Sequence, residues 1–402
     1  MLRIDSSRVL YRSIFSRMPS SIPLLDLQPE VDSLWEELNG AIQEVLKSGQ
    51  FILGPEVQKF ESEAAEYLGT KHAIGVNSGT DALVIALRAL GVKPGDEVIT
   101  TPFTFFATAE AISIIGADPV FVDIDPASFN LDPGAVEAAV TEKTSAILPV
   151  HLFGGTAAMT QLMAIAETHD LKVLEDCAQS FGATYEGLCA GCNGEHCDLS
   201  RRSTYTGKVT GTIGHAGAYS FFPTKNLGAY GDGGLIATDD DDVAKTARML
   251  RKHGGANKYL NQMLGYNSRL DALQAAILRV KLPYVDDYNA SRRRIAQRYN
   301  EYLADIDGIE TPEIPAGHVV HQYTIRVRDG QRDALSEALS DRDISSKVYY
   351  PVPCHKLPVY DMDLELPESE RAADEVLSLP IWPQASAEVQ KRVSSAIREV
   401  LE

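Results

Sequence analysis

The sequence predicts an α/β fold in which a largely parallel sheet is covered by helices on both faces, followed by a smaller α+β domain. From about residue 71 to residue 240, short β-branched runs alternate with longer apolar segments of helical periodicity. This alternation is typical of parallel strands that are buried on both faces. The chain has 402 residues. A single hydrophobic core rarely serves more than about 250–300 residues, so we expect two domains.

Six short runs have the composition of buried strands, and they follow one another along the large domain. They are EVIT (97–100), PVFVDI (119–124), AILPV (146–150), KVLED (172–176), AYSFF (218–222) and GLIAT (234–238). Three segments between them have helical periodicity: DALVIALRAL (81–90), FATAEAISII (106–115) and MTQLMAIAETH (159–169).

The second half of the chain predicts a different organisation. A long helical pattern runs from Leu270 to about Ile306 and is interrupted at Pro283. Beyond it, QYTIRV (322–327), ALSEALSD (334–341), KVYYPVP (347–353) and a final helix near 386–401 indicate the smaller domain. We expect a leader at residues 1–21, a large domain at 22–290 and a small domain at 291–402. A helix near 31–47 lies within residues 22–60, which are the part of the large domain that could instead pack on the small one.

Charge and hydropathy exclude several classes of function. The formal net charge of −19 argues against binding to nucleic acid or to an anionic membrane, which both require a concentrated basic surface. No apolar stretch approaches the roughly 20 residues that span a bilayer, so we expect a cytoplasmic protein. Four arginines within the first 17 residues superficially suit a transit peptide, but a disordered leader or an over-long start fits better.

Ligands of open α/β sheets bind at the carboxyl ends of the strands, so polar residues at these points are candidate site residues. The turn NSGTDAL (77–83) enters a helix and offers hydroxyls and backbone N–H groups to a phosphate, although a plain N-cap would look the same. Asp176 closes an apolar strand, with Gln179 one short turn further on. A buried carboxylate requires a partner, which would be either a protonated ring nitrogen or a structural salt bridge.

Two further candidates involve aromatic rings and a lysine. Phe105 and Phe106 begin a helix near a strand end, where a ring could stack on a flat cofactor or belong to the core. Lys225 lies in SFFPTKNLGAYGDGG (220–234), where four glycines follow it. A lysine in an apolar site has a lowered pKa and can form a Schiff base, whereas an exposed loop lysine would do neither. Taken together, the four features are the parts needed to hold pyridoxal 5′-phosphate.

The sequence resembles the DegT/DnrJ/EryC1/StrS family of nucleotide-sugar aminotransferases, which are fold-type I pyridoxal-phosphate enzymes. The resemblance runs from about Ile22 to the C-terminus. It rests on a series of motifs in the family's order: ILGPEVQKFE, NSGTDAL, TFFATAEAI, VHLFG, EDCAQSFGA, SFFPTKNLGAYGDGG and GYNSRLDALQAAIL.

The resemblance implies a role for each matching residue. Lys225 would be the Schiff-base lysine, and Asp176 would bind the pyridine nitrogen. The other cofactor contacts would be Gly79, Thr80 and Ser220 at the phosphate, Phe105 stacked on the ring, Gln179 beside the 3-oxygen, and Asn267 at the phosphate of the partner in a homodimer. Arg269 would reach the partner's substrate, and His321, Tyr349, Tyr350 and His355 are further substrate-binding candidates. Each of the two histidines could equally be structural.

The resemblance also implies the reaction. L-glutamate would donate its amino group to the cofactor, giving pyridoxamine phosphate, and a keto group of a nucleotide-linked sugar would then accept it. IPLLDL, QYTIRV and VYYPVPCHKLPVY look closest to members that aminate position 3, and the Tyr349–Tyr350 pair is similar to that of enzymes acting on a UDP-linked 3-oxo-uronic acid. The alternatives are a 4-keto sugar, a sugar dehydratase, in which histidine replaces the lysine, and a non-enzymatic regulator.

The segment 188–214 departs from the family pattern. It contains Cys189, Cys192 and Cys197, with His196 alongside, in a polar and glycine-rich loop. Thiolates and imidazole are zinc ligands, but the second half of a paired CxxC motif is missing. We therefore expect either a surface loop without a metal, which is the favoured interpretation, or a bound metal.

Overall fold

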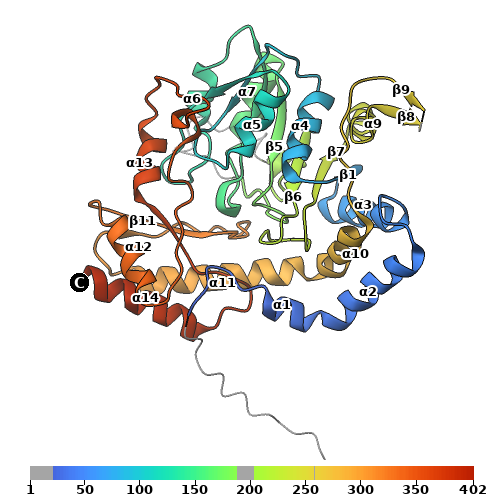
Figure 1. Cartoon of the computed structure of the whole chain (residues 1–402). Helices are drawn as coiled ribbons and strands as arrows, with labels where there is room; N and C mark the ends of the chain where they lie inside the picture. The colour runs from blue at the N-terminus through green and yellow to red at the C-terminus, as the bar shows by residue number, and fades with distance from the viewer. Residues whose placement is uncertain (1–20, 188–202, 258) are drawn as a thin grey trace, which may run out of the picture.

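The computed structural model describes residues 21–187, 203–257 and 259–402 (Figure 1). Cys189, Cys192, His196 and Cys197, the possible metal ligands, lie outside the described residues. None of the described helices is long and apolar enough to cross a membrane.

A seven-stranded sheet forms the centre of the large domain, in the order β1-β7-β6-β5-β4-β2-β3. Six strands are parallel to one another, and β7 runs antiparallel to both of its neighbours. The strands are β1(His72–Val76), β2(Glu97–Thr100), β3(Asp118–Phe121), β4(Thr144–Leu148), β5(Lys172–Asp176), β6(Ala216–Ser220) and β7(Gly234–Thr238). The predicted mostly parallel α/β fold is therefore confirmed, with small shifts at the strand ends and with β1 as an additional strand.

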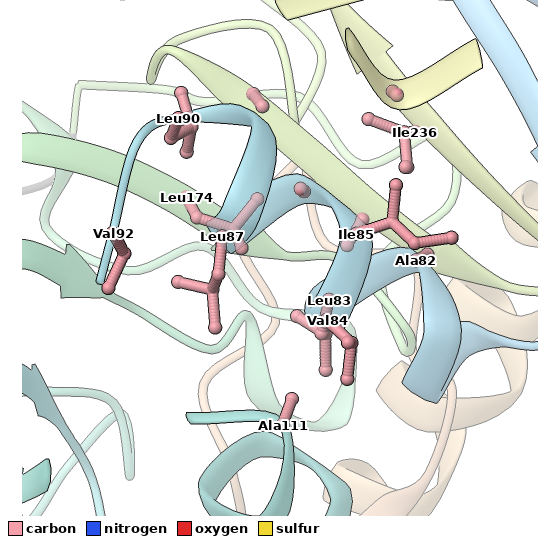
Figure 2. Close-up of a cluster of buried hydrophobic side chains, with 14 of the residues drawn as sticks. Ala82, Leu83, Val84, Ile85, Leu87, Leu90, Val92, Ala111, Leu174 and Ile236 are labelled. Atoms are coloured by element: carbon pink, nitrogen blue, oxygen red, sulfur yellow. The ribbon is translucent and has the colours of Figure 1, made fainter. Parts of the chain in front are cut away.

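Helices cover both faces of this sheet, as expected for strands that alternate between two buried sides. On one face, α4(Gly79–Ala89), α5(Ala107–Ile114) and α9(Asp241–Leu250) share an apolar cluster with Leu174 and Ile236. Figure 2 shows α4 side chains between Leu174 of β5, Ile236 of β7 and Ala111 of α5. On the other face, Val173 packs with α6(Pro133–Ala138) and α7(Met159–His169), while α3(Pro55–Leu68) and α10(Ala272–Lys281) cover β6 and β7.

The C-terminal part contains a second, antiparallel sheet of β10(Ile309–Glu310), β11(Tyr323–Val327) and β12(Val376–Leu379). Its apolar residues form one cluster with α11(Val285–Leu303), α12(Arg332–Ser340) and α14(Ala387–Leu401). The run 347–353 is not a strand, because only Lys347 forms a bridge, to Ser378. β12, which follows α13(Pro367–Glu375), supplies the strand instead.

The long helical segment breaks at Pro283, where the 3-10 turn η2(Leu282–Tyr284) separates α10 from α11. Two N-terminal helices, α1(Gln28–Ser33) and α2(Trp35–Ser48), run along this segment (Figure 1). Leu38 of α2 packs against Ile277 of α10, whereas Ile22 belongs to the core of the second sheet. The remaining short elements are β8(Gly255–Asn257), β9(Leu260–Asn261), η1(Leu152–Gly154) and η3(Cys354–Lys356).

Candidate active site

The N-terminus of α4 lies directly against the end of β6. Ser78 is the N-cap of α4, and its Oγ accepts a hydrogen bond of 3.1 Å from the backbone N–H of Asp81. A Cβ atom at Gly79 would lie 2.6 Å from Cβ of Ser220. The three predicted phosphate residues Gly79, Thr80 and Ser220 thus meet where the free N–H groups of a helix favour an anion.

Asp176 ends β5 as a buried carboxyl group with two hydrogen-bond donors. The Thr108 hydroxyl donates to Oδ2 over 2.9 Å, and the backbone N–H of Ala178 donates to Oδ1 over 3.0 Å. Burial raises the pKa of Asp176, while these donors and the charge of Lys225 oppose the increase. A further cation at this carboxylate would offset its burial, which is the property required of a partner for a protonated pyridine nitrogen.

Lys225 lies on a tight turn that follows β6. The backbone N–H of Lys225 donates to Phe222 O over 2.9 Å, and that of Ala229 donates to Phe221 O over 2.8 Å. Burial lowers the pKa of the Lys225 amine to about 8, although the nearby Asp176 carboxylate opposes this. The amine is therefore far closer to its neutral, nucleophilic form at physiological pH than an ordinary lysine is.

The glycines after Lys225 allow the backbone to pack closely on itself. A Cβ at Gly228 would lie 2.4 Å from Pro223 O, within the turn. A Cβ at Gly234 would lie 2.2 Å from Ser78 O, so β7 touches the cap of α4. Both glycines are needed to bring the lysine turn and the N-terminus of α4 together.

A buried ion pair between Lys281 and Glu30 contacts the Lys225 turn, and it was not predicted from the sequence. The Lys281 ammonium donates to Gly228 O over 2.5 Å and lies 2.6 Å from Oε1 of Glu30. Burial lowers the pKa of Lys281, and Glu30 opposes this. Lys281 lies at the end of a regular amphipathic helix, where a lysine is ordinary, so no sequence signal identified it.

The aromatic candidates lie at the mouth of the site. Phe105 is 61% exposed, and its ring centroid is 6.3 Å from that of Tyr350. The Gln179 side chain is held at both ends, because its Oε1 accepts from the backbone N–H of Phe153 over 2.6 Å and its Nε2 donates to the Tyr350 hydroxyl over 3.0 Å. Burial raises the pKa of Tyr350, and also that of its half-buried neighbour Tyr349. Phe105 is thus exposed enough to contact a ligand beside Tyr350.

The two candidate histidines are both buried but have different neighbours. His321 lies beside the lysine turn, with Nδ1 3.0 Å from Oδ1 of Asn226. The ring of His355 is fully buried, and its Nε2 is 3.1 Å from Oε1 of Glu370. His355 therefore contacts α13 in this structure and presents no exposed atom to a substrate.

Asn267 and Arg269 lie on the outside of the same region. They line an open hollow of about 710 Å³ together with Ser78 and Asp232. Asn267 is exposed, and the Ser268 hydroxyl fixes the loop by donating to Oδ1 of Asn77 over 2.8 Å. The loop thus lies at the surface next to the N-terminus of α4.

A buried group of possible metal ligands, His151, Glu175 and Cys177, lies beneath Asp176. Its carboxylate is already saturated: Glu175 accepts from His151 Nε2 and from the backbone N–H groups of Gly211, Ile213 and Gly214. Nδ1 of His151 accepts from the backbone N–H of Ala157 over 3.0 Å. These bonds give the group a structural role, which is to hold the segment 211–214 against β5.

The sequence model of the DegT/DnrJ/EryC1/StrS aminotransferase family matches residues 32–398. The chain belongs to this family.

Named relatives agree with this assignment. The chain is 49% identical to a pleiotropic regulatory protein from Geobacillus stearothermophilus, over 94% of this chain and 98% of the relative. It is 41% identical to UDP-2-acetamido-2-deoxy-3-oxo-D-glucuronate aminotransferase from Pseudomonas aeruginosa, over 94% and 99% of the two chains. Its fold matches that of NtdA from Bacillus subtilis, solved with bound cofactor PMP, with a TM-score of 0.86 at 34% identity over 96% and 86% of the chains.

The residues present fit the cofactor of such an enzyme. Only a glycine at residue 79 allows the N-terminus of α4 to approach Ser220 this closely, and the N–H groups of a helix N-terminus favour a phosphate. Asp176 supplies a buried carboxyl group. Lys225 supplies an amine whose pKa is lowered by burial, and the two residues interact electrostatically.

Proposed function

We propose that this chain is a pyridoxal-phosphate-dependent aminotransferase that moves an amino group from L-glutamate to carbon 3 of a nucleotide-linked keto sugar. The observation that carries the proposal is the electrostatic pairing of Lys225 with Asp176 beside the N-terminus of α4. Lys225, Asp176 and the N-terminus of α4 supply the three groups that pyridoxal phosphate requires of a protein: an amine, an acid and a phosphate site.

The residues of the chain would divide these functions among themselves. Gly79, Thr80 and Ser220 would bind the phosphate, Asp176 would keep the pyridine nitrogen protonated, and Lys225 would bind the aldehyde covalently. Phe105 would stack on the ring and Gln179 would lie beside the 3-oxygen, so that Tyr350, which is bonded to Gln179, is also close to the ring. When bound, pyridoxal phosphate supplies an electron sink for the carbon that loses its proton.

Lys225 would then act as the proton carrier. A general base works best when its pKa lies near the working pH, and the pKa of about 8 for Lys225 meets this condition. Its turn is closed by backbone hydrogen bonds at both ends, so the amine would return to the same position after each transfer.

Substrate recognition would involve residues around the mouth of the site. Tyr350 contacts Phe105 and Tyr349 contacts Tyr350, which supports a role for the tyrosine pair, and Arg269 lies on the loop that carries Asn267. The 41% identity with an aminotransferase whose name specifies a UDP-linked 3-oxo-glucuronate supports amination at position 3 and a UDP-linked uronic acid as the first substrate to test. His355 would contact the sugar only if its contact with Glu370 opened.

We propose a homodimer in which the loop of one subunit completes the active site of the other. Asn267 is exposed, and Leu264 in the same loop is 86% exposed. Tyr259 and Leu260, a few residues before Leu264, are also exposed, by 85% and 55%. Exposed apolar side chains that gather in one region, rather than singly, mark an interaction surface, which supports the proposed interface.

The decisive experiment follows the visible absorbance of the purified protein. Wild type should bind pyridoxal phosphate with an absorbance band that glutamate abolishes, and Lys225→Ala should lose both the band and turnover. Lys93→Ala is the control, because Lys93 is exposed. The proposal is wrong if wild type binds no cofactor. If glutamate leaves the band unchanged, a dehydratase is favoured instead.

Substrate assays would then separate the remaining alternatives. UDP- and dTDP-linked 3-keto and 4-keto sugars are offered with glutamate, and the UDP-linked 3-oxo-uronic acid is expected to react fastest. The name of the Geobacillus relative favours a regulatory role as a second candidate function. That role would require the Lys225→Ala protein to retain its effect in the cell, whereas an enzyme would lose it.

A further inference from the structure

The carboxyl group of Asp176 is bonded to a threonine that is itself bonded to a second threonine. The Thr108 hydroxyl, in the first turn of α5, donates to Oδ2 of Asp176 over 2.9 Å. Oγ1 of Thr104 lies 2.9 Å from Oγ1 of Thr108. All three residues are buried, with 1–4% of their surface exposed. The three side chains thus form one chain of hydrogen bonds that ends on Asp176.

The ionised form of Asp176 determines the direction of this chain. A carboxylate accepts only, so the single hydrogen of the Thr108 hydroxyl is used in the bond to Oδ2. The bond between the two threonines must then use the hydrogen of Thr104. Because a hydroxyl that accepts a hydrogen bond is polarised and donates more strongly, Thr104 strengthens the bond from Thr108 to Asp176.

Both threonines are held in place through their backbones. The Cys354 thiol donates to Thr104 O over 3.8 Å, and the backbone N–H of Cys354 donates to Pro102 O over 2.8 Å. The backbone N–H of Thr108 donates to Phe105 O over 3.2 Å. A β-branched side chain on a fixed backbone has few rotamers, so the two hydroxyls are preorganised toward the carboxyl group.

Three titratable groups near Asp176 do not supply a positive charge to it. Burial raises the pKa of Cys177 and of Tyr350, so both are neutral near physiological pH. Nδ1 of His151 accepts a hydrogen bond from a backbone N–H group, which a cationic ring could not do. None of these groups therefore replaces the hydrogen bonds as a source of stabilisation for the carboxylate.

Lys225 does supply a positive charge, but not in every state. Its charge lowers the pKa of Asp176, and its own pKa is about 8. The lysine must give up this charge to act as a nucleophile or a base. Threonine hydroxyls do not titrate, so the hydrogen bonds from Thr104 and Thr108 support Asp176 in both states of the lysine.

We propose that Thr104 and Thr108 are positioning residues, and that the ordered chain from the Thr104 hydroxyl through the Thr108 hydroxyl to Oδ2 holds and stabilises the carboxylate form of Asp176. This inference rests on the proposed role of Asp176 as the anion that keeps the pyridine nitrogen protonated. Hydrogen bonds to a carboxylate favour the charged form over the neutral acid. Thr108 acts directly and Thr104 acts through Thr108, so the effect of Thr104 is the smaller one.

Substitutions that nearly keep the side-chain shape separate this role from packing. Thr108→Val removes the hydroxyl that donates to Asp176, Thr104→Val removes only the second hydroxyl, and Thr108→Ser keeps a hydroxyl at the first position. Thr100→Val is the matched control. Thr100 is also buried, and its hydroxyl donates to Leu148 O over 2.8 Å rather than to Asp176.

The first measurement follows the infrared C=O band of the protonated Asp176 carboxyl group against pH, in the protein without cofactor. The band is identified by its absence from Asp176→Asn. Loss of the Thr108 donor disfavours the ionised form, so Thr108→Val should raise the midpoint by about one to two pH units. Thr104→Val should raise it less, whereas Thr108→Ser and Thr100→Val should keep the wild-type midpoint. The proposal is overturned if Thr108→Val leaves the midpoint unchanged or lowers it, or if Thr108→Ser raises it equally.

The second measurement is the pH dependence of the glutamate half-reaction in the enzyme with cofactor. Thr108→Val should be about tenfold slower at neutral pH and should regain rate at higher pH, where Asp176 ionises again. A loss that is the same at every pH, and that Thr100→Val shares, would be a packing effect and would overturn the proposal.

Two further outcomes are decided by the infrared titration. If Thr108→Val does not fold, the midpoint of Thr104→Val takes its place: an upward shift supports the proposal, and an unchanged midpoint overturns it. The titration needs no cofactor, so failure of wild type to bind pyridoxal phosphate would count against the proposed function and would leave the test of the threonine chain intact.

Discussion

Gly79 lies so close to Ser220 that a methyl group on Gly79 would be 2.6 Å from Cβ of the serine. This contact joins the first turn of α4 to the end of β6, two elements that are far apart in the sequence. It also places the free N–H groups of the helix next to a hydroxyl, which suits a phosphate group.

Gly79→Ala should therefore damage the phosphate site. The methyl group would push Ser220 or α4 away, at a cost of about 1–3 kcal/mol for an overpacked position. If this free-energy cost is paid only when the cofactor is bound, the affinity for pyridoxal phosphate should fall about tenfold or more. Titration of the apoprotein with cofactor, followed by absorbance, measures this directly.

Gly40→Ala is the matched control for Gly79→Ala. Gly40 lies in α2 with nothing within 4 Å of an added Cβ, so alanine should stabilise the protein by about 0.5–1 kcal/mol. Unchanged cofactor affinity in Gly79→Ala would contradict the assignment of the phosphate site.

Asp176→Asn should slow the glutamate half-reaction at least about a hundredfold, the usual effect of removing one preorganised charge. The amide can keep the contacts to Thr108 and to the N–H of Ala178, so the fold should survive. What is lost is the negative charge that would keep the pyridine nitrogen protonated. Asp118→Asn, at the exposed start of β3, is the control and should react at the wild-type rate. Full activity of Asp176→Asn would refute this role.

The Lys225 amine should titrate at a pH of about 8 in the apoprotein. Below this pH the ammonium form dominates and reacts slowly with an amine-specific reagent, and above it the neutral amine reacts quickly. Competitive labelling across pH, with Lys225 quantified by mass spectrometry, gives the midpoint. In Asp176→Asn the midpoint should move to lower pH, because the carboxylate raises the pKa of the lysine. An unshifted midpoint would show that the Asp176 carboxylate does not affect the pKa of Lys225.

The sequence predicted those parts of the fold and site that depend on local pattern. The buried strands were identified because their apolar runs are short and bounded by polar residues, and Asp176 and Lys225 stood out because polar groups ended such runs. β1 and β12 were missed because periodicity alone does not assign a short apolar run: HAIGV is interrupted by a glycine, and VLSL directly follows the helix α13.

The parts of the site that depend on distant contacts could not be predicted in this way. Asn226, Asn289 and His321 lie on three different elements, and only folding brings their side chains into one network. The glycines after Lys225 suggested freedom of the backbone near a ligand, but their actual neighbours are Pro223 O and Ser78 O. A glycine in the sequence indicates that another group can lie close to the backbone, but it does not identify that group.

The ion pair of Lys281 and Glu30 is almost completely buried. Lys281→Met leaves the Glu30 carboxylate buried without its partner and removes the donor to Gly228 O. Breaking a buried pair in this way usually costs about 3–5 kcal/mol. Arg292 still interacts electrostatically with Glu30, so we expect the loss of stability to lie near the lower end of this range.

The double variant Lys281→Met/Glu30→Gln should regain most of the stability that Lys281→Met loses, because no buried charge is then unpaired. Equilibrium unfolding in urea measures both. Lys47→Met is the control: Lys47 pairs with Glu44 on the exposed face of α2, and such pairs contribute at most about 1 kcal/mol. If the double variant is as stable as wild type but its glutamate half-reaction is still slower, the bond from Lys281 to Gly228 O positions the Lys225 turn. If its rate equals that of wild type, the ion pair stabilises the fold and the turn holds its shape through its own backbone hydrogen bonds and through Asn226.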